Sequence, residues 1–247
     1  MSKEHIIFGI YPVLEAVKSN VTIDKLFVQK GIKNTTIDEI VTTLEESNTS
    51  ISFVPGEKLD KLTRSNHQGI AAFSSPIAFQ SIEDVVEKAL SNESKAPLFL
   101  ILDQISDVRN FGAIIRTAEC THVDAIIIQK KGGAPVSGDT VKTSAGAIFK
   151  TPLCKVDHIK DAIFYLQGSG IKVVAATEKT EQSIYDCDLT IPTALVMGSE
   201  GKGISKSVLG LVDERASLPL LGEINSLNVS VACGAFLYET VRQRRNV

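Results

Sequence analysis

Apolar segments alternate with helical patterns from Pro97 to the end of the chain, at the spacing of βαβ units. Leu98–Leu102 is apolar without interruption, as is typical of a strand buried on both faces of a sheet. This alternation predicts an α/β fold built on a parallel sheet. Further strands are expected at 125–129, 151–156, 172–176, 194–197 and 216–218, and helices at 113–121, 158–168, 205–212 and 229–245.

The first 75 residues contain shorter strands and helices and predict a separate, small α/β domain. Thr36 can cap a helix there through its side-chain oxygen, and Asp38 and Glu39 in the first turn suit the helix dipole. The segment 76–96 is Ser-rich and acidic, with one amphipathic helix that Ser81 caps. We interpret this segment as a linker, so the expected domains are 1–75 and 97–247. In the first domain, strands are expected at 5–8, 25–28, 52–54 and 69–73, and helices at 12–18 and 37–46.

Composition limits the class of protein. Hydrophobic residues make up 43% of the 247 residues, which is enough for a globular core. No apolar run reaches the roughly 18 residues that span a bilayer. The first residues lack the pattern of a signal peptide. We therefore expect a cytoplasmic protein with no membrane partner.

The net charge of −3 argues mildly against a nucleic-acid partner, because proteins that bind nucleic acids usually carry an excess of basic residues. The total charge does not report local patches, however. Eight cationic residues are candidates for one basic face, and an ordinary mixed surface is the alternative. They are Arg109, Arg116, Lys130, Lys131, Lys142, Arg242, Arg244 and Arg245.

The four cysteines are widely separated, and the four histidines are scattered. Neither residue type shows the close spacing of a metal site or of a disulfide framework. We expect no metal, and we interpret Cys120, Cys154, Cys187 and Cys233 as buried, reduced thiols.

An apolar strand runs directly into a glycine-rich loop in Leu195–Ser205, LVMGSEGKGIS. Its three glycines surround the carboxylate of Glu200, and glycine permits backbone to approach a ligand closely. The spacing does not match the nicotinamide-binding G-x-G-x-x-G fingerprint, and the loop lacks the hydroxyl residue of a P-loop. A tight turn between strand and helix is the alternative interpretation.

A second polar cluster, Asn110-x-Gly112-x-x-x-Arg116, lies near the expected start of a helix. Gly112 lowers helix stability by about 1 kcal/mol relative to Ala, which suggests close approach by a ligand or by backbone. Arg116 follows about one turn later on the same face, and its planar guanidinium suits a phosphate. The alternatives are a helix cap at Asn110 and an ordinary surface position for Arg116.

The third cluster, Ser226–Ser230 (SLNVS), precedes the C-terminal helix. Its polar residues Ser226 and Asn228 alternate with apolar ones. A helix cap at Ser226, with Asn228 in the first turn, is the alternative to a role in a ligand site. Three separated polar clusters in apolar surroundings suggest one composite site.

In this order and spacing, the three clusters resemble the three motifs of the SpoU (TrmH) family of RNA ribose 2′-O-methyltransferases. The resemblance covers residues 97–245. Phe8–Glu15 and His67–Ala71 also resemble the small substrate-binding domain of this family. Family members that carry this domain and methylate a guanosine in 23S rRNA are the most similar. The matching positions are Asn110, Gly112, Arg116, Met197, Gly198, Glu200, Gly201, Gly203, Leu218-Pro219-Leu220 and Ser226–Ser230.

The resemblance implies an α/β SPOUT methyltransferase domain with a trefoil knot, a ribosomal-protein-like N-terminal domain, a homodimer and S-adenosylmethionine as methyl donor. It places Arg116 beside the reacting 2′-hydroxyl. A guanidinium hardly ever loses its proton in proteins, so we expect Arg116 to hold the adjacent phosphate and orient the hydroxyl. A phosphate oxygen or a perturbed Arg116 then takes the proton. The implied catalytic residues are Asn110, Arg116, Glu200, Ser226 and Asn228, and the implied cofactor-binding residues are Gly198, Leu218 and Leu227.

The expected function is therefore S-adenosylmethionine-dependent methylation of a guanosine 2′-hydroxyl in 23S rRNA. Three alternatives stay open: a tRNA ribose methyltransferase, a non-catalytic RNA-binding protein of the same fold, and a nucleotide-dependent oxidoreductase.

Overall fold

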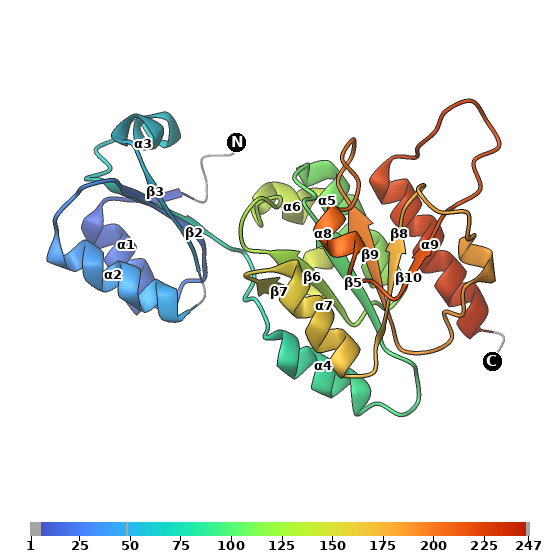
Figure 1. The fold of residues 1–247 in the computed structure, drawn as a ribbon. Coiled ribbons are helices and arrows are strands. Elements are labelled where there is room, and N and C mark those ends of the chain that lie inside the picture. The colour runs from blue at the N-terminus through green and yellow to red at the C-terminus, as the bar shows by residue number, and fades with distance from the viewer. Residues whose placement is uncertain (1–5, 48, 246–247) are drawn as a thin grey trace. The chain divides into compact units, whose positions relative to one another are not determined.

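The computed structural model describes residues 6–47 and 49–245, which form two compact units (Figure 1). The first unit contains the described residues up to Ala78 together with Pro135–Asp139, and the second contains the others. Each unit has its own sheet and its own apolar core. Each therefore buries apolar surface by itself, as independent domains do.

The elements of residues 6–78 are β1 (Ile6–Phe8), α1 (Ile10–Lys18), β2 (Ile23–Gln29), α2 (Thr35–Glu46), β3 (Ser50–Val54), α3 (Gly56–Leu62) and β4 (Ile70–Ser74). The strand order is β1-β4-β2-β3, with β2 and β3 parallel and the other neighbours antiparallel. Successive side chains of a strand point to opposite faces. Leu26 thus packs with α1 and α2, whereas Phe27 packs with α3.

This first unit departs from the expected pattern in two places. Asn34, not Thr36, caps α2, because its side chain accepts hydrogen bonds from the amides of Thr36 and Ile37. The sequence pattern does not predict the helix α3, because its Pro-Gly start has the composition of a turn. Of the strand expected at 5–8, His5 lies outside the described residues.

The second unit confirms the predicted α/β fold with a parallel sheet. Its strand order is β10-β8-β9-β5-β6-β7, and every neighbouring pair is parallel. From residue 79 onward the elements are α4 (Ile82–Leu90), β5 (Leu98–Asp103), α5 (Val108–Cys120), β6 (Ala125–Gln129), α6 (Gly138–Thr143), β7 (Leu153–Val156), α7 (Ile159–Gly168), β8 (Lys172–Ala176), β9 (Thr193–Gly198), α8 (Lys206–Leu209), β10 (Glu214–Ala216) and α9 (Val229–Arg244), with short 3₁₀ helices at Ala147–Phe149 and Ile184–Asp186.

Two layers of helices cover this parallel sheet. α4, α7 and α8 contribute apolar side chains to one core cluster, together with strand residues such as Phe99 and Ile127. α5 and α9 pack against each other, and α9 also packs on β8 and β9 (Figure 1). The contact between these two helices is close: a Cβ added at Gly234 would lie 3.8 Å from Cγ2 of Thr117. This packing brings the start of α9 beside the start of α5.

The helix α4 packs in the core of the second unit, although the sequence suggested a linker at 76–96. Ser81 caps it as expected, by accepting hydrogen bonds from the amides of Glu83 and Asp84. Its apolar stripe, which includes Ile82 and Val85, is buried. An amphipathic helix gains stability by such burial, which explains why this segment is not an extended connection. The domain limits 1–75 and 97–247 stay a prediction.

The helix α5 begins five residues earlier than the predicted start at residue 113. Asp107 caps it, because its Oδ1 accepts hydrogen bonds from the amides of Arg109 and Asn110, both at 2.9 Å. The interpretation of Asn110 as the helix cap is therefore wrong. Asn110 lies inside the first turn, where its side chain is available for other contacts.

Three of the four cysteines are buried, but Cys120 is exposed at the end of α5, which corrects the expectation for that residue. Among the described residues, no helix has the length and apolar character needed to cross a bilayer.

Candidate active site

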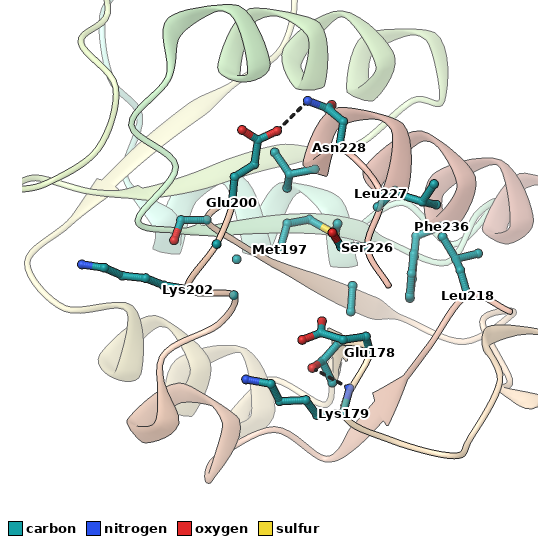
Figure 2. Close-up of a pocket in the computed structure, with 18 of the residues that line it drawn as sticks. Glu178, Lys179, Met197, Glu200, Lys202, Leu218, Ser226, Leu227, Asn228 and Phe236 are labelled. Atoms are coloured by element: carbon teal, nitrogen blue, oxygen red, sulfur yellow. Dashed lines mark hydrogen bonds between the residues drawn. The ribbon is translucent and has the colours of Figure 1, made fainter. Parts of the chain in front are cut away.

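The carboxyl ends of β5, β8 and β9 meet at one edge of the second sheet, because these strands are parallel neighbours. Ligands of open α/β sheets bind outside such strand ends. A cavity of about 410 Å³ lies there (Figure 2). It is lined by residues at the ends of β8 and β9, by residues that follow β8, β9 and β10, and by the first half of α9: Ala176–Lys179, Met197–Gly203, Leu218, Leu220, Ser226–Val229, Ala232 and Phe236.

The glycine-rich loop after β9 folds back on itself at the cavity. Ser199 and Gly203 exchange backbone hydrogen bonds of 3.2 and 2.8 Å. Gly201 and Gly203 have φ of +81° and +67°, in the left-handed region that favours glycine. A Cβ at Gly198 would lie 2.2 Å from the backbone of Gly203 and Ile204. The tight turn and the cavity wall are therefore the same structure, and its glycines are needed for the turn itself.

The end of this loop is tied to the neighbouring strand. The carboxylate of Asp103, the last residue of β5, is buried and accepts a hydrogen bond from the amide of Ser205. The backbone of β9 holds the loop at its beginning, because Gly198 lies in register with Asp103. The loop is thus held at both ends by the edge of the sheet.

One side chain joins the three polar clusters of the sequence. The Oδ1 atom of Asn228 accepts hydrogen bonds from the amides of Ser230 and Val231, so Asn228 caps α9. Its Nδ2 atom donates to Oε1 of Glu200 at 2.6 Å, as Figure 2 shows, and to Oδ1 of Asn110 at 3.0 Å. The glycine loop, the start of α5 and the start of α9 therefore meet at one asparagine.

Ser226 lines the cavity, but it does not cap the helix. The interpretation of Ser226 as the cap and Asn228 as a first-turn residue is wrong by two positions. Asn228 uses its oxygen for the cap, which leaves its nitrogen free to bridge Glu200 and Asn110. Asn228 therefore both caps α9 and links the polar side chains of the site.

Charged side chains that the sequence did not single out also line the cavity. Glu178 and Lys179 follow β8, and Lys202 belongs to the glycine loop (Figure 2). Together with Glu200, they give the cavity two carboxylates and two ammonium groups. The position of Glu178 and Lys179 could have been predicted from the sequence, because polar residues directly after a buried parallel strand lie at the ligand-binding edge of the sheet.

Apolar side chains form another part of the cavity wall. Met197 and Phe236 are buried, and Leu218 and Leu227 are partly exposed to the cavity and solvent (Figure 2). A site with an apolar wall and a few convergent polar groups suits an organic ligand that has an apolar ring and a charged end.

Close packing against α6 requires a glycine at position 112. A Cβ there would lie 2.0 Å from Oγ1 of Thr143 and 2.8 Å from the carbonyl carbon of Thr143. The expected close approach is therefore confirmed as an approach by backbone and by a side chain of α6. Because Oγ1 of Thr143 also donates to the carbonyl of Val108, this contact ties α6 to the first turns of α5.

Arg116 lies outside the cavity. Its side chain is exposed on α5, and it is not among the lining residues. The cavity brings together Gly198, Glu200, Leu218, Ser226, Leu227 and Asn228, and Asn110 joins them through its hydrogen bond to Asn228. A role of Arg116 at this site stays a prediction.

Comparison with known proteins decides the family. The SpoU rRNA Methylase family matches residues 97–238, and the RNA 2'-O ribose methyltransferase substrate binding family matches residues 6–80. A protein of Staphylococcus haemolyticus, named as a TrmH-family tRNA/rRNA methyltransferase, is 34% identical over 98% of this chain and 97% of its own. A protein of the same name from Staphylococcus saprophyticus is 33% identical over 99% of this chain and 98% of its own. The chain belongs to the SpoU/TrmH family of RNA methyltransferases.

Solved structures share the fold of this SpoU/TrmH protein. The SpoU methyltransferase AviRb from Streptomyces viridochromogenes, solved in complex with AdoMet, has a TM-score of 0.63 at 22% identity, over 98% of this chain and 91% of its own. A TrmH/SpoU tRNA modifying enzyme of A. aeolicus has a TM-score of 0.57 at 28% identity, over 67% of this chain and 85% of its own.

Several cations of the expected basic face are engaged within this SpoU/TrmH chain. Lys130 pairs with Asp157 at 2.8 Å, and Arg242 forms a two-pronged pair with Glu239. Arg244 is turned inward and donates to four backbone carbonyls. These three residues contribute little free positive charge at the surface.

Within residues 6–47 and 49–245, no cluster of three or more His, Cys, Asp or Glu side chains could hold a metal ion.

Proposed function

We propose that this SpoU/TrmH protein transfers a methyl group from S-adenosylmethionine to a ribose 2′-hydroxyl of RNA, with a guanosine of 23S rRNA as its target. The observation that carries the proposal is the pair of hydrogen bonds from Asn228 to Glu200 and Asn110. These bonds join three distant segments at the rim of one cavity. A site assembled in this way is preorganised, as positioning catalysis requires.

The residues of the cavity fit the methyl donor. A volume of about 410 Å³ suits a ligand of this size, since ligand pockets span roughly 300–1,000 Å³. Leu218, Leu227 and Phe236 offer an apolar surface for an adenine ring. Lys179 and Lys202 suit a carboxylate, and the carboxylates of Glu178 and Glu200 suit an ammonium group or ribose hydroxyls. When bound, S-adenosylmethionine supplies a methyl group already activated on a sulfonium.

The protein must then present the ribose hydroxyl in line with that methyl group, with the reacting atoms about 3–3.5 Å apart. Asn110, Glu200 and Asn228 form a cross-linked set that can hold the nucleotide in one orientation. Arg116, whose side chain is exposed, is free to bind a phosphate of the incoming RNA and to orient the hydroxyl. A phosphate oxygen accepts the hydroxyl proton, because a guanidinium is a poor base.

A tRNA is the second candidate substrate. The names of the curated relatives include tRNA as well as rRNA, and a tRNA modifying enzyme shares the fold. That enzyme aligns with 67% of this chain, whereas the family of substrate-binding domains matches residues 6–80 in addition. The extra domain favours the larger RNA.

We also propose that the protein is a homodimer. Val231 and Tyr238 are 58% and 56% exposed on α9. They are seven residues apart, about two helical turns, and so share one side of the helix. Burial of these two side chains against a second copy would stabilise the assembly. The trefoil knot and the cytoplasmic location stay predictions.

The decisive experiment is transfer of labelled methyl groups to purified 23S rRNA and to tRNA, followed by mapping of 2′-O-methyl positions. We expect incorporation into one guanosine of 23S rRNA, strongly reduced in Asn228→Ser. Incorporation into tRNA alone would move the target to the second candidate. If neither RNA is labelled although S-adenosylhomocysteine binds, the catalytic proposal fails.

A further inference from the structure

Two carboxylates line the cavity of the second unit, and only one of them is engaged. Oε1 of Glu200 accepts a hydrogen bond of 2.6 Å from Nδ2 of Asn228. The side chain of Glu178 is exposed to the cavity, and over residues 6–47 and 49–245 it has neither a hydrogen bond nor an ion pair. The carboxylate of Glu178 is therefore available to a ligand.

The backbone on both sides of Glu178 is held in place. Thr177, the residue before it, is buried, and its amide donates to the carbonyl of Ala216 at 2.9 Å. The Oγ1 atom of Thr177 accepts a hydrogen bond of 3.2 Å from the amide of Lys179, the residue after it. Glu178 thus has a defined position at the end of β8, and a charge that is positioned before a ligand arrives binds it at a lower cost in entropy.

The character of the cavity changes from one side to the other. The ammonium groups of Lys179 and Lys202 lie on one side, and the described residues give neither of them an ion pair (Figure 2). In the same view the carboxylate of Glu178 lies between the ammonium group of Lys179 and the apolar side. That apolar side is formed by Leu218, Leu227 and Phe236.

The groups of S-adenosylmethionine follow one another in the same order. Its adenine ring is at one end, the carboxylate and ammonium of the amino acid are at the other, and the ribose and the sulfonium lie between them. The leucine and phenylalanine side chains suit the ring, and the two lysines suit the carboxylate. This match leaves the carboxylate of Glu178 beside the middle of the ligand, where the sulfonium carries its positive charge.

Methyl transfer removes that positive charge. The bond between sulfur and the methyl carbon breaks, and its electron pair stays on sulfur, which becomes a neutral thioether. The methyl carbon forms a bond to the ribose oxygen, and the hydroxyl proton goes to a phosphate oxygen. Donor and product otherwise share the ring, the ribose and the amino acid. A carboxylate near sulfur therefore attracts the donor and not the product at this point of the ligand.

We propose that Glu178 is a specificity-determining residue, whose carboxylate attracts the sulfonium and so makes the cavity prefer the methyl donor over S-adenosylhomocysteine. The inference rests on the proposed function for the identity of the donor. Attraction to a charge that disappears during the reaction does not accelerate the chemical step. The benefit lies in turnover instead, because the cavity holds the ligand less tightly once the methyl group has left.

Three ligands and a matched pair of variants test this role in the full-length protein. Glu178→Gln keeps the size of the side chain and removes its charge. The control Glu181→Gln makes the same change in the same loop, at an exposed residue that does not line the cavity. Calorimetry measures the dissociation constants of S-adenosylmethionine, S-adenosylhomocysteine and sinefungin, in which a carbon bearing an ammonium group replaces the sulfonium. Thermal unfolding without ligand compares the folding of the variants.

We expect Glu178→Gln to bind S-adenosylmethionine and sinefungin about tenfold more weakly, because an opposite charge within about 4–6 Å shifts a protonation equilibrium by at least that factor. S-adenosylhomocysteine should change by less than about twofold, since its sulfur is neutral. Glu178→Asp keeps the charge and should retain part of the preference for the two cationic ligands. Glu181→Gln should match the wild type for all three ligands and in thermal unfolding.

Equal weakening of all three ligands in Glu178→Gln would overturn the proposal, because Glu178 would then contact the ribose hydroxyls or the ammonium group that the ligands share. Unchanged binding of all three would overturn it as well. In both cases, methyl transfer to RNA by the wild type would leave the proposed function standing. The reverse result, the expected pattern of binding without methyl transfer to any RNA, would refute the proposed function and leave the charge preference of the cavity established.

Discussion

Asp103 and Ser205 are 102 positions apart in the sequence, yet the carboxylate of one accepts a hydrogen bond of 2.7 Å from the amide of the other. This contact fastens the glycine loop to the end of β5. Asp103→Ala removes the acceptor and leaves a partly buried N–H group without a partner. Hydrogen bonds to charged groups contribute about 1.5–3 kcal/mol. We expect a loss of stability of that order and weaker binding of S-adenosylhomocysteine.

Urea unfolding and calorimetry check this prediction. Asp103→Asn is the matched control, because its amide oxygen keeps the shape and an acceptor. It should lose less stability and less affinity than Asp103→Ala. Equal stability of Asp103→Ala and the wild type would show that the loop does not depend on this bond.

The two hydrogen-bonding ends of Asn228 can be tested separately. Asn228→Ser keeps a side-chain oxygen for the cap of α9 but removes the nitrogen that reaches Glu200 and Asn110. Ser and Asn are similarly good caps, so stability should change by less than about 0.5 kcal/mol. Methyl transfer should fall by about a hundredfold, the scale on which small errors in positioning reduce rates. Single-turnover methylation and thermal unfolding measure the two effects.

Asn228→Ala provides the comparison, because it loses both ends. Its stability should fall by a further amount of about 1 kcal/mol, the typical worth of a helix cap. If Asn228→Ser keeps full activity, the link between the three clusters is structural only.

Gly112→Ala should destabilise the protein by more than about 2 kcal/mol, because overpacking of this kind typically costs 1–3 kcal/mol. The added Cβ would overlap Thr143, including its backbone, so a rotation of that side chain cannot relieve the clash. Gly168→Ala is the control. Gly168 also lies in a helix, and nothing lies within 4 Å of a Cβ there. It should be neutral or slightly stabilising, since Ala is the better helix former. Similar unfolding free energies for both variants would contradict the packing argument.

The sequence was sufficient for the parallel sheet, because strands buried on both faces leave long apolar runs. The expected strands at 125–129 and 172–176 coincide with β6 and β8. The sequence did not predict the helix α3 or the correct start of α5, because the residues there are mostly polar. α3 is only seven residues long, and α5 starts at a cap, Asp107, that is followed by a glycine within its first turns.

The candidate site was only partly predictable for a different reason. The hydrogen bond between Asn228 and Asn110 joins residues 118 positions apart, and no periodicity encodes such a contact. The family resemblance identified both residues. Glu178 and Lys179 belong to no motif, and only the order of the strands places them at the cavity.

The buried thiols should be inert in the native protein. Burial raises the pKa of Cys154 to about 12, with a smaller effect of the charges of Glu83 and Asp84. Burial likewise raises the pKa of Cys187 to about 11 and that of Cys233 to about 12. Because the thiolate is the reactive form, these thiols become reactive only as the pH approaches such values.

At pH 8, iodoacetamide should therefore modify one thiol of the native protein and four after denaturation, as counted by intact mass. The reactive thiol should be Cys120, which is exposed. Cys120→Ser should abolish the native reaction. Rapid modification of Cys233 in folded protein would show that α9 opens readily.

Hydrogen bonds from the Arg244 side chain hold the C-terminal end of α9 against the rest of the second unit. Its guanidinium donates to carbonyls in the segments that precede β5 and β9 over distances of 2.5–3.1 Å, and burial lowers its pKa. The acceptors are the backbone oxygens of Ala96, Pro97, Leu189 and Ile191. Arg is suited to this task, since its planar fork presents five donors, whereas Lys presents three on one atom.

Arg244→Met should reduce the free energy of unfolding by about 3 kcal/mol, because several carbonyls lose a charged donor at once. Arg244→Lys should lie between Arg244→Met and the wild type, since an ammonium can reach some of the acceptors but not all. Arg245→Ala, at the exposed end of the same helix, should change stability by less than about 0.5 kcal/mol. Urea unfolding gives the three values. Because Arg244 does not line the cavity, S-adenosylhomocysteine should bind folded Arg244→Met as it binds the wild type. If Arg244→Met is as stable as the wild type but binds the cofactor more weakly, Arg244 supports the cofactor site and not the stability of the fold.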